Sequence, residues 1–458
     1  MFTADGDFLL FDYFRVPYRR SGDIGDLGTV RADATGRLLL YPRRSSTERP
    51  QAFALDAMRL FGSVVDECDM QRRLPDDGWE PLSWLRLQHG AATAAWRNAR
   101  GDVALAFDPA EIVTSFWSEA WAAGRWADHA WAGFRRAYYC VRPALPRPAQ
   151  IAARRAVSHV QARAAFPAWP VENSLHDFYD WMFALLKELA GSPIPAIDLW
   201  PDGHRWALVL THDVETECGL ANIHLLREIE RVRGYSSSWS FVPRRYEVGR
   251  AVVEDLRSAG CEVAVHGLRH DGRDVRPLSS LMERLPEMRR YAESWGAVGF
   301  RSPATHRDWD AMRLLGFDYD SSYPDTDPFE PQPGGCCSWL PFFNESLVEL
   351  PITLTQDHTL LTILRRDERG WIEKARHLRD RGGMALLLTH PDYMLTRSAR
   401  GAYARFLDAF AEDGTVWRAL PREVSEWWRR RAASSLGQGD GGWVVTGPAS
   451  TDGRVVAL

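Results

Sequence analysis

The stretch "LVLTHDVETECG", residues 208–219, decides how this chain is interpreted. Three apolar residues lead directly into Thr211 and His212, and two carboxylates, Asp213 and Glu215, follow. The pattern predicts a buried strand that ends in polar groups. Because the two carboxylates are two residues apart, they lie on the same side of an extended segment. The sequence therefore predicts a site with charged side chains at the end of a core strand.

Further apolar runs follow this strand, and amphipathic segments separate them. The runs read "CEVAVHG", "AVGFRS", "LVELPITL" and "GMALLLTH". Strands that alternate with helices predict parallel pairing with both sheet faces covered, which is an α/β layered fold or a barrel. Ligands of such folds meet the carboxyl ends of the strands.

Several of these strand ends carry residues that can do chemistry. His266 and His270 are four residues apart, so both imidazoles share one face if a helical turn follows. Two imidazoles and a carboxylate are the usual three-ligand set of a catalytic divalent metal. Arg301 and His390 end two other strands. Taken singly, Asp213 could cap a helix, Arg301 could pair with a structural carboxylate, and His390 could be a core histidine.

Length and composition indicate a globular protein of more than one domain. A chain of 458 residues is too long for one ordinary core, and 45% hydrophobic with 26% charged residues is typical of globular proteins. The net charge of -5 provides no basic field, so we expect no nucleic-acid partner. No apolar run approaches the roughly 18 residues that a membrane span needs.

The cysteines and the first residues predict a reduced, cytoplasmic setting. Six cysteines in a chain of this length do not form a disulfide framework. The N-terminal "MFTADGDFLL" places acidic residues where a secretory signal needs positive ones. The adjacent Cys336 and Cys337 could respond to oxidation or be two ordinary thiols.

Changes in texture along the chain predict three parts: residues 1–195, of mixed strands and then helices; residues 196–432, the α/β part; and a tail, 433–458. In the first part, "DFLLFDYFRVPY", "TGRLLLYP" and "GDVALAF" are interpreted as strands. Residues 111–139 have tryptophans at helical spacing, including Trp126 and Trp131.

Three further segments have recognisable signals. "LPRPAQIAARR" is a candidate linker, and "NSLHDFYDWMFALLKELAG" is a helix capped by Asn173 or Ser174 and ended by Gly191. In the tail, "WVVTG" and "GRVVAL" predict a β-hairpin, which we expect to pack on the N-terminal region.

The order of the strand-end motifs resembles that of the polysaccharide deacetylase family, over about residues 205–430. These carbohydrate esterases share the chitooligosaccharide deacetylase homology domain. "THDVE" is similar to the family's Thr-Phe-Asp-Asp strand end, "HGLRH" to its paired histidines and "RSPA" to its Arg-x-Pro turn. "DYDSSYP" is similar to its fourth motif and "LLLTHP" to its closing Leu-x-x-His-Pro. The resemblance implies a distorted (β/α) barrel of about seven strands that holds one divalent metal, most often zinc.

The resemblance also implies a metal-binding set. His266 and His270 fall on the histidine ligand positions. Val214 occupies the family's second acidic place, and the carboxylate comes one residue later at Glu215. Some branches carry an Asp-Val-Asp variant in which the later carboxylate is the ligand, and Glu215 is one methylene longer than that aspartate.

The catalytic roles follow from the same resemblance. Asp213 is implied to be the general base that deprotonates a water, with Arg301 orienting it. His390 is implied to protonate the leaving amine. His212 falls on an aromatic position and is expected to pack beside the site. Asp357, followed by His358, comes after another strand and could contact substrate or surround the site.

The expected function is that of a metal-dependent hydrolase that removes an N-acetyl or related acyl group from an amino sugar or polysaccharide precursor. Two alternatives remain open: a carbohydrate-binding or assembly protein that keeps the fold without turnover, and a hydrolase of a non-sugar amide C–N bond. The proline- and glycine-rich residues 323–337 predict a long irregular loop, which either shapes specificity near the site or lies on the surface without function.

Overall fold

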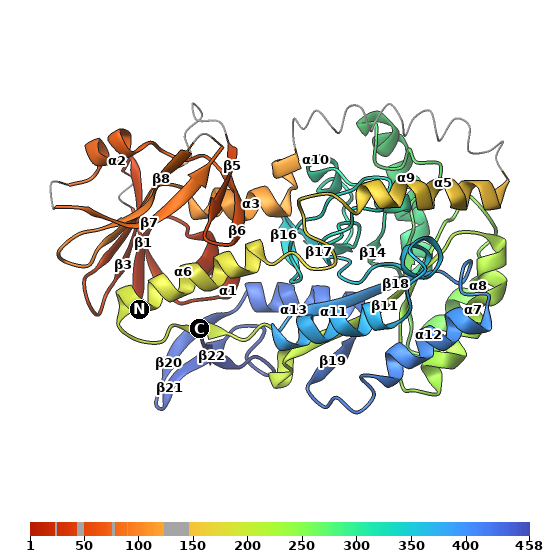
Figure 1. The fold of residues 1–458 in the computed structure, drawn as a ribbon. Coiled ribbons are helices and arrows are strands. Elements are labelled where there is room, and N and C mark those ends of the chain that lie inside the picture. The colour runs from red at the N-terminus through yellow and green to blue at the C-terminus, as the bar shows by residue number, and fades with distance from the viewer. Residues whose placement is uncertain (23–24, 44–49, 76–77, 89, 123–145) are drawn as a thin grey trace. The chain divides into compact units, whose positions relative to one another are not determined.

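A computed structural model describes residues 1–22, 25–43, 50–75, 78–88, 90–122 and 146–458. The described chain forms two compact units (Figure 1). The first comprises residues 1–122, 173–203 and 429–458, and the second comprises residues 146–172 and 204–428. Each unit therefore contains segments that are far apart in the sequence.

The first unit is built on a nine-stranded sheet of order β2-β1-β3-β4-β9-β8-β7-β5-β6. Its strands are β1 (Phe2–Asp5), β2 (Tyr18–Ser21), β3 (Leu27–Ala32), β4 (Leu38–Pro42), β5 (Gln51–Leu55), β6 (Met58–Gly62), β7 (Glu80–Leu87), β8 (Gly90–Arg97) and β9 (Val103–Leu105). Its helices are α1 (Leu9–Phe14), α2 (Glu67–Arg73), α3 (Pro109–Trp117), η1 (Ala120–Ala122), α6 (Ser174–Ala190) and η3 (Pro201–Gly203). Helices α3 and α6 pack against β6, and α6 also packs against β4.

The N-terminal predictions are confirmed in part. "TGRLLLYP" and "GDVALAF" contain β4 and β9, as predicted. The strand predicted within "DFLLFDYFRVPY" is wrong, because its apolar residues form α1 and bury Leu10, Phe11, Tyr13 and Phe14. A short apolar run fits a buried helix as well as a strand, and here the helical spacing prevails.

Of the predictions about helices and linkers, some are confirmed and one is wrong. Helix α6 has the predicted bounds, and Gly191 ends it in the left-handed conformation at φ 66°. The predicted linker is wrong, because residues 147–161 form α5 (Arg147–Gln161), with proline in the first turn where no N–H is needed. Helix α3 and η1 agree with the helical spacing of residues 111–122. The rest of that prediction, including Trp126 and Trp131, lies outside the described residues.

The predicted C-terminal hairpin has the wrong partners. Strand β21 (Gly442–Thr446) pairs with β20 (Ser435–Gly439), and β22 (Val455–Ala457) pairs antiparallel with β10 (Pro195–Ile197). The overlooked signal is the Asp-Gly pair at residues 440–441, which favours a two-residue hairpin turn. The buried Arg431 joins this region by donating to the carbonyls of Tyr13, Phe14, Ile197 and Asp198.

The second unit contains another nine-stranded sheet, of order β16-β17-β15-β14-β13-β12-β11-β18, with β19 also paired to β11. Its strands are β11 (Trp206–Val214), β12 (Ser238–Phe241), β13 (Glu262–Val265), β14 (Gly299–Phe300), β15 (Tyr319–Asp320), β16 (Phe342–Asn344), β17 (Leu347–Glu349), β18 (Met384–Thr389) and β19 (Val416–Ala419). Every pairing is parallel except that of β16 with β17. The predicted α/β class is therefore confirmed.

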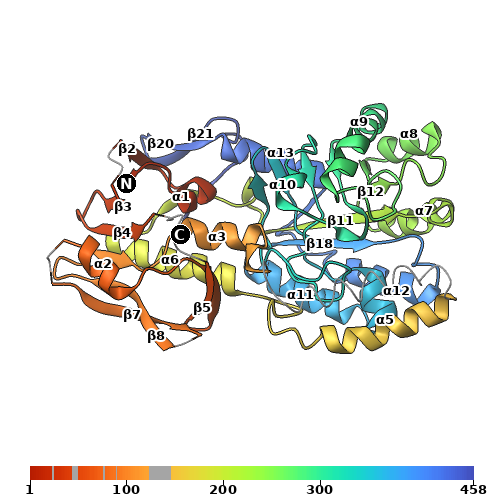
Figure 2. The same ribbon diagram turned by 90° about the horizontal axis from the view of Figure 1, so that it is seen from above.

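Helices cover both faces of this sheet (Figure 2). The helices of the second unit are α5, α7 (Glu217–Arg231), α8 (Arg250–Ser258), α9 (Leu278–Trp295), η4 (Pro303–Thr305), α10 (Trp309–Met312), the π-helical turn η5 (His358–Ile363), α11 (Arg369–Asp380), α12 (Arg397–Asp408) and α13 (Pro421–Ala432), whose residues from Arg429 onward belong to the first unit. Helices α7 and α11 pack against β11, and α8 and α9 pack against β13. All nine residues of β11 are buried, as expected for a central parallel strand.

The sheet of the second unit is curled. Beyond β17 the chain continues to Leu354, which forms a parallel bridge to Leu387 of β18. The two ends of the strand order therefore approach each other through this bridge. A closed barrel of seven strands stays a prediction.

Residues 323–337 contain no helix or strand, as predicted, but most of them are buried. Within this loop Asp325 forms an ion pair with Lys374 at 2.7 Å, and Glu330 accepts a hydrogen bond from Thr359 at 2.8 Å. The alternative of an exposed surface loop is therefore wrong. Cys336 and Cys337 are buried, and neither forms a disulfide.

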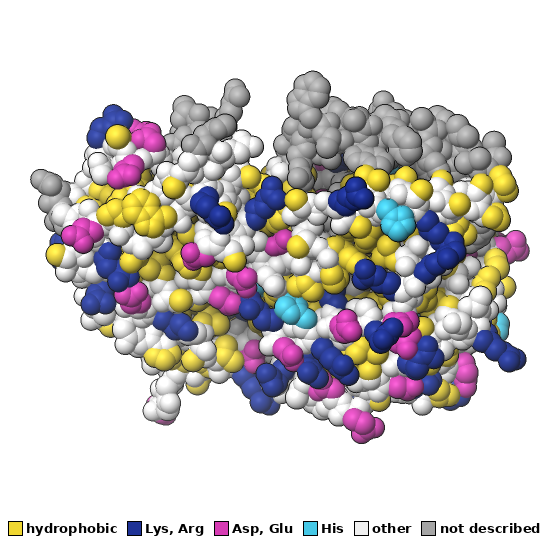
Figure 3. All heavy atoms as spheres, in the orientation of Figure 1, with side chains coloured by type: hydrophobic (Ala, Val, Ile, Leu, Met, Phe, Trp, Pro, Cys, Tyr) yellow, Lys and Arg dark blue, Asp and Glu magenta, His cyan; other side chains and the backbone are white. Residues whose placement is uncertain are grey.

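Within the described residues, no helix has both the length and the apolar character that crossing a membrane requires. On the face drawn in Figure 3, Lys and Arg side chains are interspersed with Asp and Glu side chains. That face carries no broad area of one charge.

Candidate metal and catalytic site

The six candidate residues come from adjacent strands of the second sheet. Asp213 is the penultimate residue of β11, and Glu215 directly follows the strand. His266 and His270 follow β13, Arg301 follows β14, and His390 follows β18. Since these strands run parallel in the order β18-β11-β12-β13-β14, their carboxyl ends meet at one edge. The structure therefore brings all six to the edge where α/β folds bind ligands.

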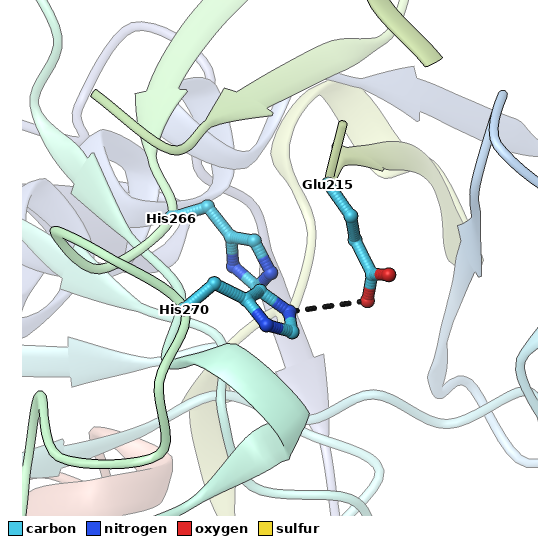
Figure 4. A group of neighbouring side chains, drawn as sticks. All are labelled: Glu215, His266 and His270. Carbon is cyan, nitrogen blue, oxygen red and sulfur yellow. Dashed lines mark hydrogen bonds and ion pairs between the residues drawn. The ribbon is translucent and has the colours of Figure 1, made fainter. Parts of the chain in front are cut away.

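Three of them form a cluster that can hold a cation. One ligand atom from each of Glu215, His266 and His270 can be chosen so that all lie within 4.8 Å of one another. Figure 4 shows the three side chains pointing toward a common space, Glu215 from the end of β11 and the histidines from the segment after β13. The anticipated third ligand is thus turned toward the histidines rather than away from them.

The helical turn that would place both imidazoles on one face does not form. Residues 266–270 are irregular, and both Gly267, at φ 62°, and His270, at φ 56°, are left-handed. A Cβ at Gly267 would collide with the side chains of Asp274 and Pro303. Glycine therefore allows the backbone at residue 267 to lie close to these two side chains. The two imidazoles still meet, with ring centroids 5.2 Å apart.

His266 has the hydrogen bonding of a metal ligand. Its Nδ1 lies 3.1 Å from the carbonyl oxygen of Arg301, so Nδ1 carries the proton and donates it. Its Nε2 is buried and has no hydrogen-bond partner within the described protein. Burial lowers the pKa of His266 to about 4, which keeps the ring neutral. A buried imidazole nitrogen with a free lone pair is what a divalent cation requires.

Glu215 offers one oxygen to the same space. Its Oε1 lies 3.1 Å from Nε2 of His270, close to the roughly 3.3 Å between two ligands of one tetrahedral zinc-sized ion. Its Oε2 accepts a hydrogen bond from the hydroxyl of Tyr393 at 2.6 Å. Burial alone would raise the pKa of Glu215, but His270 outweighs it and holds that pKa well below its usual value. The donor set, two imidazoles and an ionised carboxylate, fits a divalent cation.

Asp213 lies beside this cluster. Its Oδ2 is 3.7 Å from Nε2 of His266, and its Oδ1 is 3.4 Å from Nη1 of Arg301. Burial opposes ionisation, but His266 and Arg301 together lower the pKa of Asp213 below its usual value. Asp213 does not cap the following helix, because Thr216 accepts the hydrogen bond from the N–H of Gly219. Its buried carboxylate therefore remains available for chemistry.

The guanidinium of Arg301 is fixed on every side. Nε donates to the carbonyl of Ser321 at 2.7 Å, and Nη2 donates to the hydroxyl of the same residue at 2.8 Å. Nη1 donates to the hydroxyl of Thr211 at 2.8 Å as well as facing Asp213. Ser321 belongs to the "DYDSSYP" motif, so this segment holds the arginine in place.

His390 is held by Asp357. Its Nδ1 lies 2.7 Å from Oδ1 of Asp357, and its backbone N–H donates to Oδ2 at 2.9 Å. Burial favours the neutral ring, but the Asp357 carboxylate prevails and raises the pKa of His390 to about 10. His390 is therefore an imidazolium at neutral pH, and its Nε2 is the nitrogen left to serve a substrate.

His212 faces away from the cluster. Its ring stacks on Trp239 with centroids 4.1 Å apart. Its nitrogens lie 2.7 Å from Oγ1 of Thr389 and 2.7 Å from Oε1 of Glu230. His212 thus packs beside the site, as expected from the sequence.

Two residues next to the cluster were not anticipated. Asp392 and Tyr393 follow the "LTHP" motif directly and contact Glu215 through its backbone and its side chain. The ring of His358, expected near the site, lies 4.5 Å from that of Tyr393. The signal for Asp392 and Tyr393 was their place in "LTHPDY", two and three residues after His390.

In comparisons with known proteins, this chain is similar to several solved structures. No family model matches the sequence. No curated protein matches it either. A Mycobacterium smegmatis protein assigned as a polysaccharide deacetylase is 21% identical, over 51% of this chain and 93% of its own, with a TM-score of 0.43.

Two further structures are similar over about half of this chain. PuuE allantoinase is 17% identical over 50% of this chain and 92% of its own, with a TM-score of 0.41. A Pseudomonas aeruginosa PAO1 protein, also assigned as a polysaccharide deacetylase, is 17% identical over 54% of this chain and 97% of its own, with a TM-score of 0.42. Two of these three structures are assigned as polysaccharide deacetylases.

Proposed function

We propose that this chain is a metal-dependent hydrolase that removes an N-acetyl or related acyl group from an amino sugar or polysaccharide precursor. The observation that carries the proposal is one constellation of three parts. A three-residue ligand cluster stands beside an ionised aspartate, and a protonated histidine ends a neighbouring strand. Such a set supplies a cation site, a base and an acid, which amide hydrolysis requires together.

Glu215, His266 and His270 would hold the cation, most plainly zinc given two imidazoles and a carboxylate. When bound, such an ion supplies Lewis acidity, which acidifies a water and polarises an acyl carbonyl. Asp213 would accept the proton from the attacking water. Arg301 favours that role because it keeps the carboxylate ionised and fixes its orientation.

His390 would donate a proton to the departing nitrogen. An amine leaves an acyl centre poorly unless it is protonated, so this step needs an acid that is charged at neutral pH. Asp357 supports the role by binding Nδ1, which leaves the proton on Nε2 for the substrate. The arrangement thus serves amides, for which an acid matters more than it does for esters.

The test combines metal analysis with a substrate panel. Purified protein should hold about one zinc per chain and release acetate from a chitooligosaccharide or a nucleotide-linked N-acetyl sugar. Asp213→Asn should reduce the release by about 10²- to 10⁴-fold, which is the usual contribution of a general base. Asp255→Asn changes an exposed carboxylate on α8 that pairs with Arg227, and it should retain the wild-type rate.

Three results would refute this function. One is acetate release that survives both chelation and Asp213→Asn. The second is turnover of a cyclic amide with no release from any N-acetyl sugar, which would indicate a hydrolase of non-sugar C–N bonds instead. The third is sugar binding that needs no metal and leads to no turnover, which would indicate a binding protein.

A further inference from the structure

The segment that follows His390 contacts the end of β11 directly. Oδ2 of Asp392 accepts a hydrogen bond from the backbone N–H of Glu215 at 2.9 Å, and Oδ1 accepts one from the hydroxyl of Thr216. A Cβ at Gly219 would overlap the Asp392 carboxylate, so glycine leaves the room that this contact needs. The backbone on which Glu215 is mounted is therefore fixed from the neighbouring strand end.

The side chain of Glu215 is fixed by the next residue. The hydroxyl of Tyr393 donates to Oε2 at 2.6 Å, while Oε1 faces His270. The ring of Tyr393 is itself held, with centroids 4.5 Å from His358 and 5.1 Å from His390. A phenol at neutral pH is a hydrogen-bond donor, so this contact suits an ionised carboxylate.

We propose that Asp392 and Tyr393 are positioning residues that make Glu215 a one-oxygen metal ligand, a role that rests on the proposed metal-dependent function. Glutamate has three rotatable side-chain bonds and would otherwise sample many carboxylate positions. The two contacts restrict it at both ends: Asp392 at the backbone and Tyr393 at Oε2. Oε1 is thereby the oxygen presented to the cation, and the Val214-Glu215 arrangement becomes a working ligand site.

The first test measures zinc affinity in the full chain by competition with a chromophoric chelator. Tyr393→Phe removes the hydroxyl that contacts Oε2, and we expect zinc to bind about 10- to 100-fold more weakly, as when other partners of metal ligands are removed. Tyr246→Phe is the matched control. Its hydroxyl contacts the carbonyl of Val214 at the same strand end but not the Glu215 carboxylate, so its zinc affinity should stay near that of the wild type.

The second test asks whether Tyr393 acts through Glu215. In a Glu215→Ala background, Tyr393→Phe should cause no further loss of zinc affinity, because the side chain that it positions is gone. Circular dichroism of each variant establishes that the fold persists.

The outcomes separate the two proposals. Wild-type zinc affinity in Tyr393→Phe, or an equal loss with and without Glu215, overturns the positioning role and leaves the proposed function intact. A wild-type chain that binds no zinc overturns both. Loss in Tyr393→Phe that matches the loss in Tyr246→Phe also overturns the positioning role, because it would reflect the strand end in general.

Discussion

Asp213 keeps its charge in the core because of the way Arg301 is held. Burial would raise the pKa of a carboxylate, and a guanidinium free to turn toward solvent would compensate little. Arg301 cannot turn, since Ser321 and Thr211 accept from three of its nitrogens. The pKa of the proposed base therefore depends on Ser321 and Thr211, which hold Arg301 in place.

Replacing Arg301 with lysine should weaken this control. An ammonium cannot contact Ser321 and Asp213 together as the planar guanidinium does. The pKa of Asp213, now below its usual 3.8, should rise, and kcat/KM at neutral pH should fall by about 10²-fold. Because the pKa of Asp213 is lower in the folded than in the unfolded chain, the ionised carboxylate stabilises the fold at pH values above the unfolded pKa. This stability is lost as the pH falls through the folded pKa. Acid unfolding should consequently begin at a higher pH in Arg301→Lys.

Acid titration followed by circular dichroism, with a pH profile of kcat/KM, checks this expectation. Arg227→Lys changes an exposed pair with Asp255 and should move neither the unfolding midpoint nor the acidic limb, because surface pairs contribute about 0–1 kcal/mol. If the acidic limb of Arg301→Lys coincided with that of the wild type, Arg301 would not be what lowers the pKa of Asp213.

Asp357 raises the pKa of His390, whereas Arg301 lowers the pKa of Asp213. The His390 pKa of about 10 means that the ring stays protonated at neutral pH, and the stability gained from its pair with Asp357 is complete below about 6.5. That contribution is lost only as pH rises through about 10. Asp357→Asn removes the charge, so burial should bring the pKa of His390 below 6.5 and shift the alkaline limb of kcat/KM to lower pH.

An NMR titration of the histidine side chains measures this pKa without any substrate. Asp367→Asn is a suitable control, because this carboxylate pairs with Arg369 on the surface. If His390 in Asp357→Asn still titrated near 10, the carboxylate would not be what charges it.

At the level of elements, the sequence predicts the site better than its surroundings. Strands β11 and β18 are long apolar runs in a buried parallel sheet, so both they and the residues at their ends could be located. Strands β14 and β15 have two residues each, which is too short for any periodicity. The apolar run "AVGFRS" nevertheless predicted that Arg301 ends a strand, and β14 directly precedes it.

Contacts between loops could not be predicted from periodicity. His266 and His270 have the spacing of a helical turn, yet Gly267 and His270 are left-handed. The two imidazoles still lie close together, but through an irregular backbone rather than a helix. The contact of Tyr393 with Glu215 joins residues 178 positions apart and depends on the order of β11 and β18 in the sheet. Such order is a tertiary property, which no local pattern encodes.

The junction of β11 and α7 provides a prediction about an element. Alanine in a helix is favoured over glycine by about 1 kcal/mol, but a Cβ at Gly219 would displace Asp392. Displacement breaks two hydrogen bonds to a carboxylate, each of about 1.5–3 kcal/mol, so the loss exceeds the gain. Gly219→Ala should destabilise the protein by about 2–5 kcal/mol in urea unfolding.

Gly401→Ala is the matched control. Gly401 lies inside α12, and the nearest atom to a Cβ at this position would be Nη1 at the far end of the Arg405 side chain, at 3.2 Å. This substitution should be neutral or stabilise the protein by up to about 1 kcal/mol. Equal effects of the two substitutions would show that the Asp392 contact contributes nothing to stability.

On the scale of the whole molecule, all three ligand residues belong to the second unit. Glu215 and His270 come from loops 55 residues apart in the sequence, and His266 precedes the second loop. A cation bound there would link the end of β11 to the end of β13. Because a ligand stabilises only the state that binds it, the gain should fall on the second unit.

Hydrogen exchange measured peptide by peptide can show this selectivity, whereas a single melting temperature is poorly defined for a chain of two units. Zinc at about 100 times its Kd should add about 2.7 kcal/mol to the stability of the binding unit. Peptides from β11, β13 and β18 should then exchange more slowly, and chelation should reverse the change. Peptides from β3 and β4 of the first unit should exchange at the same rate throughout. In Glu215→Gln the protection of the second unit by zinc should shrink. Zinc protection that is equal in both units would mean that the ion binds elsewhere.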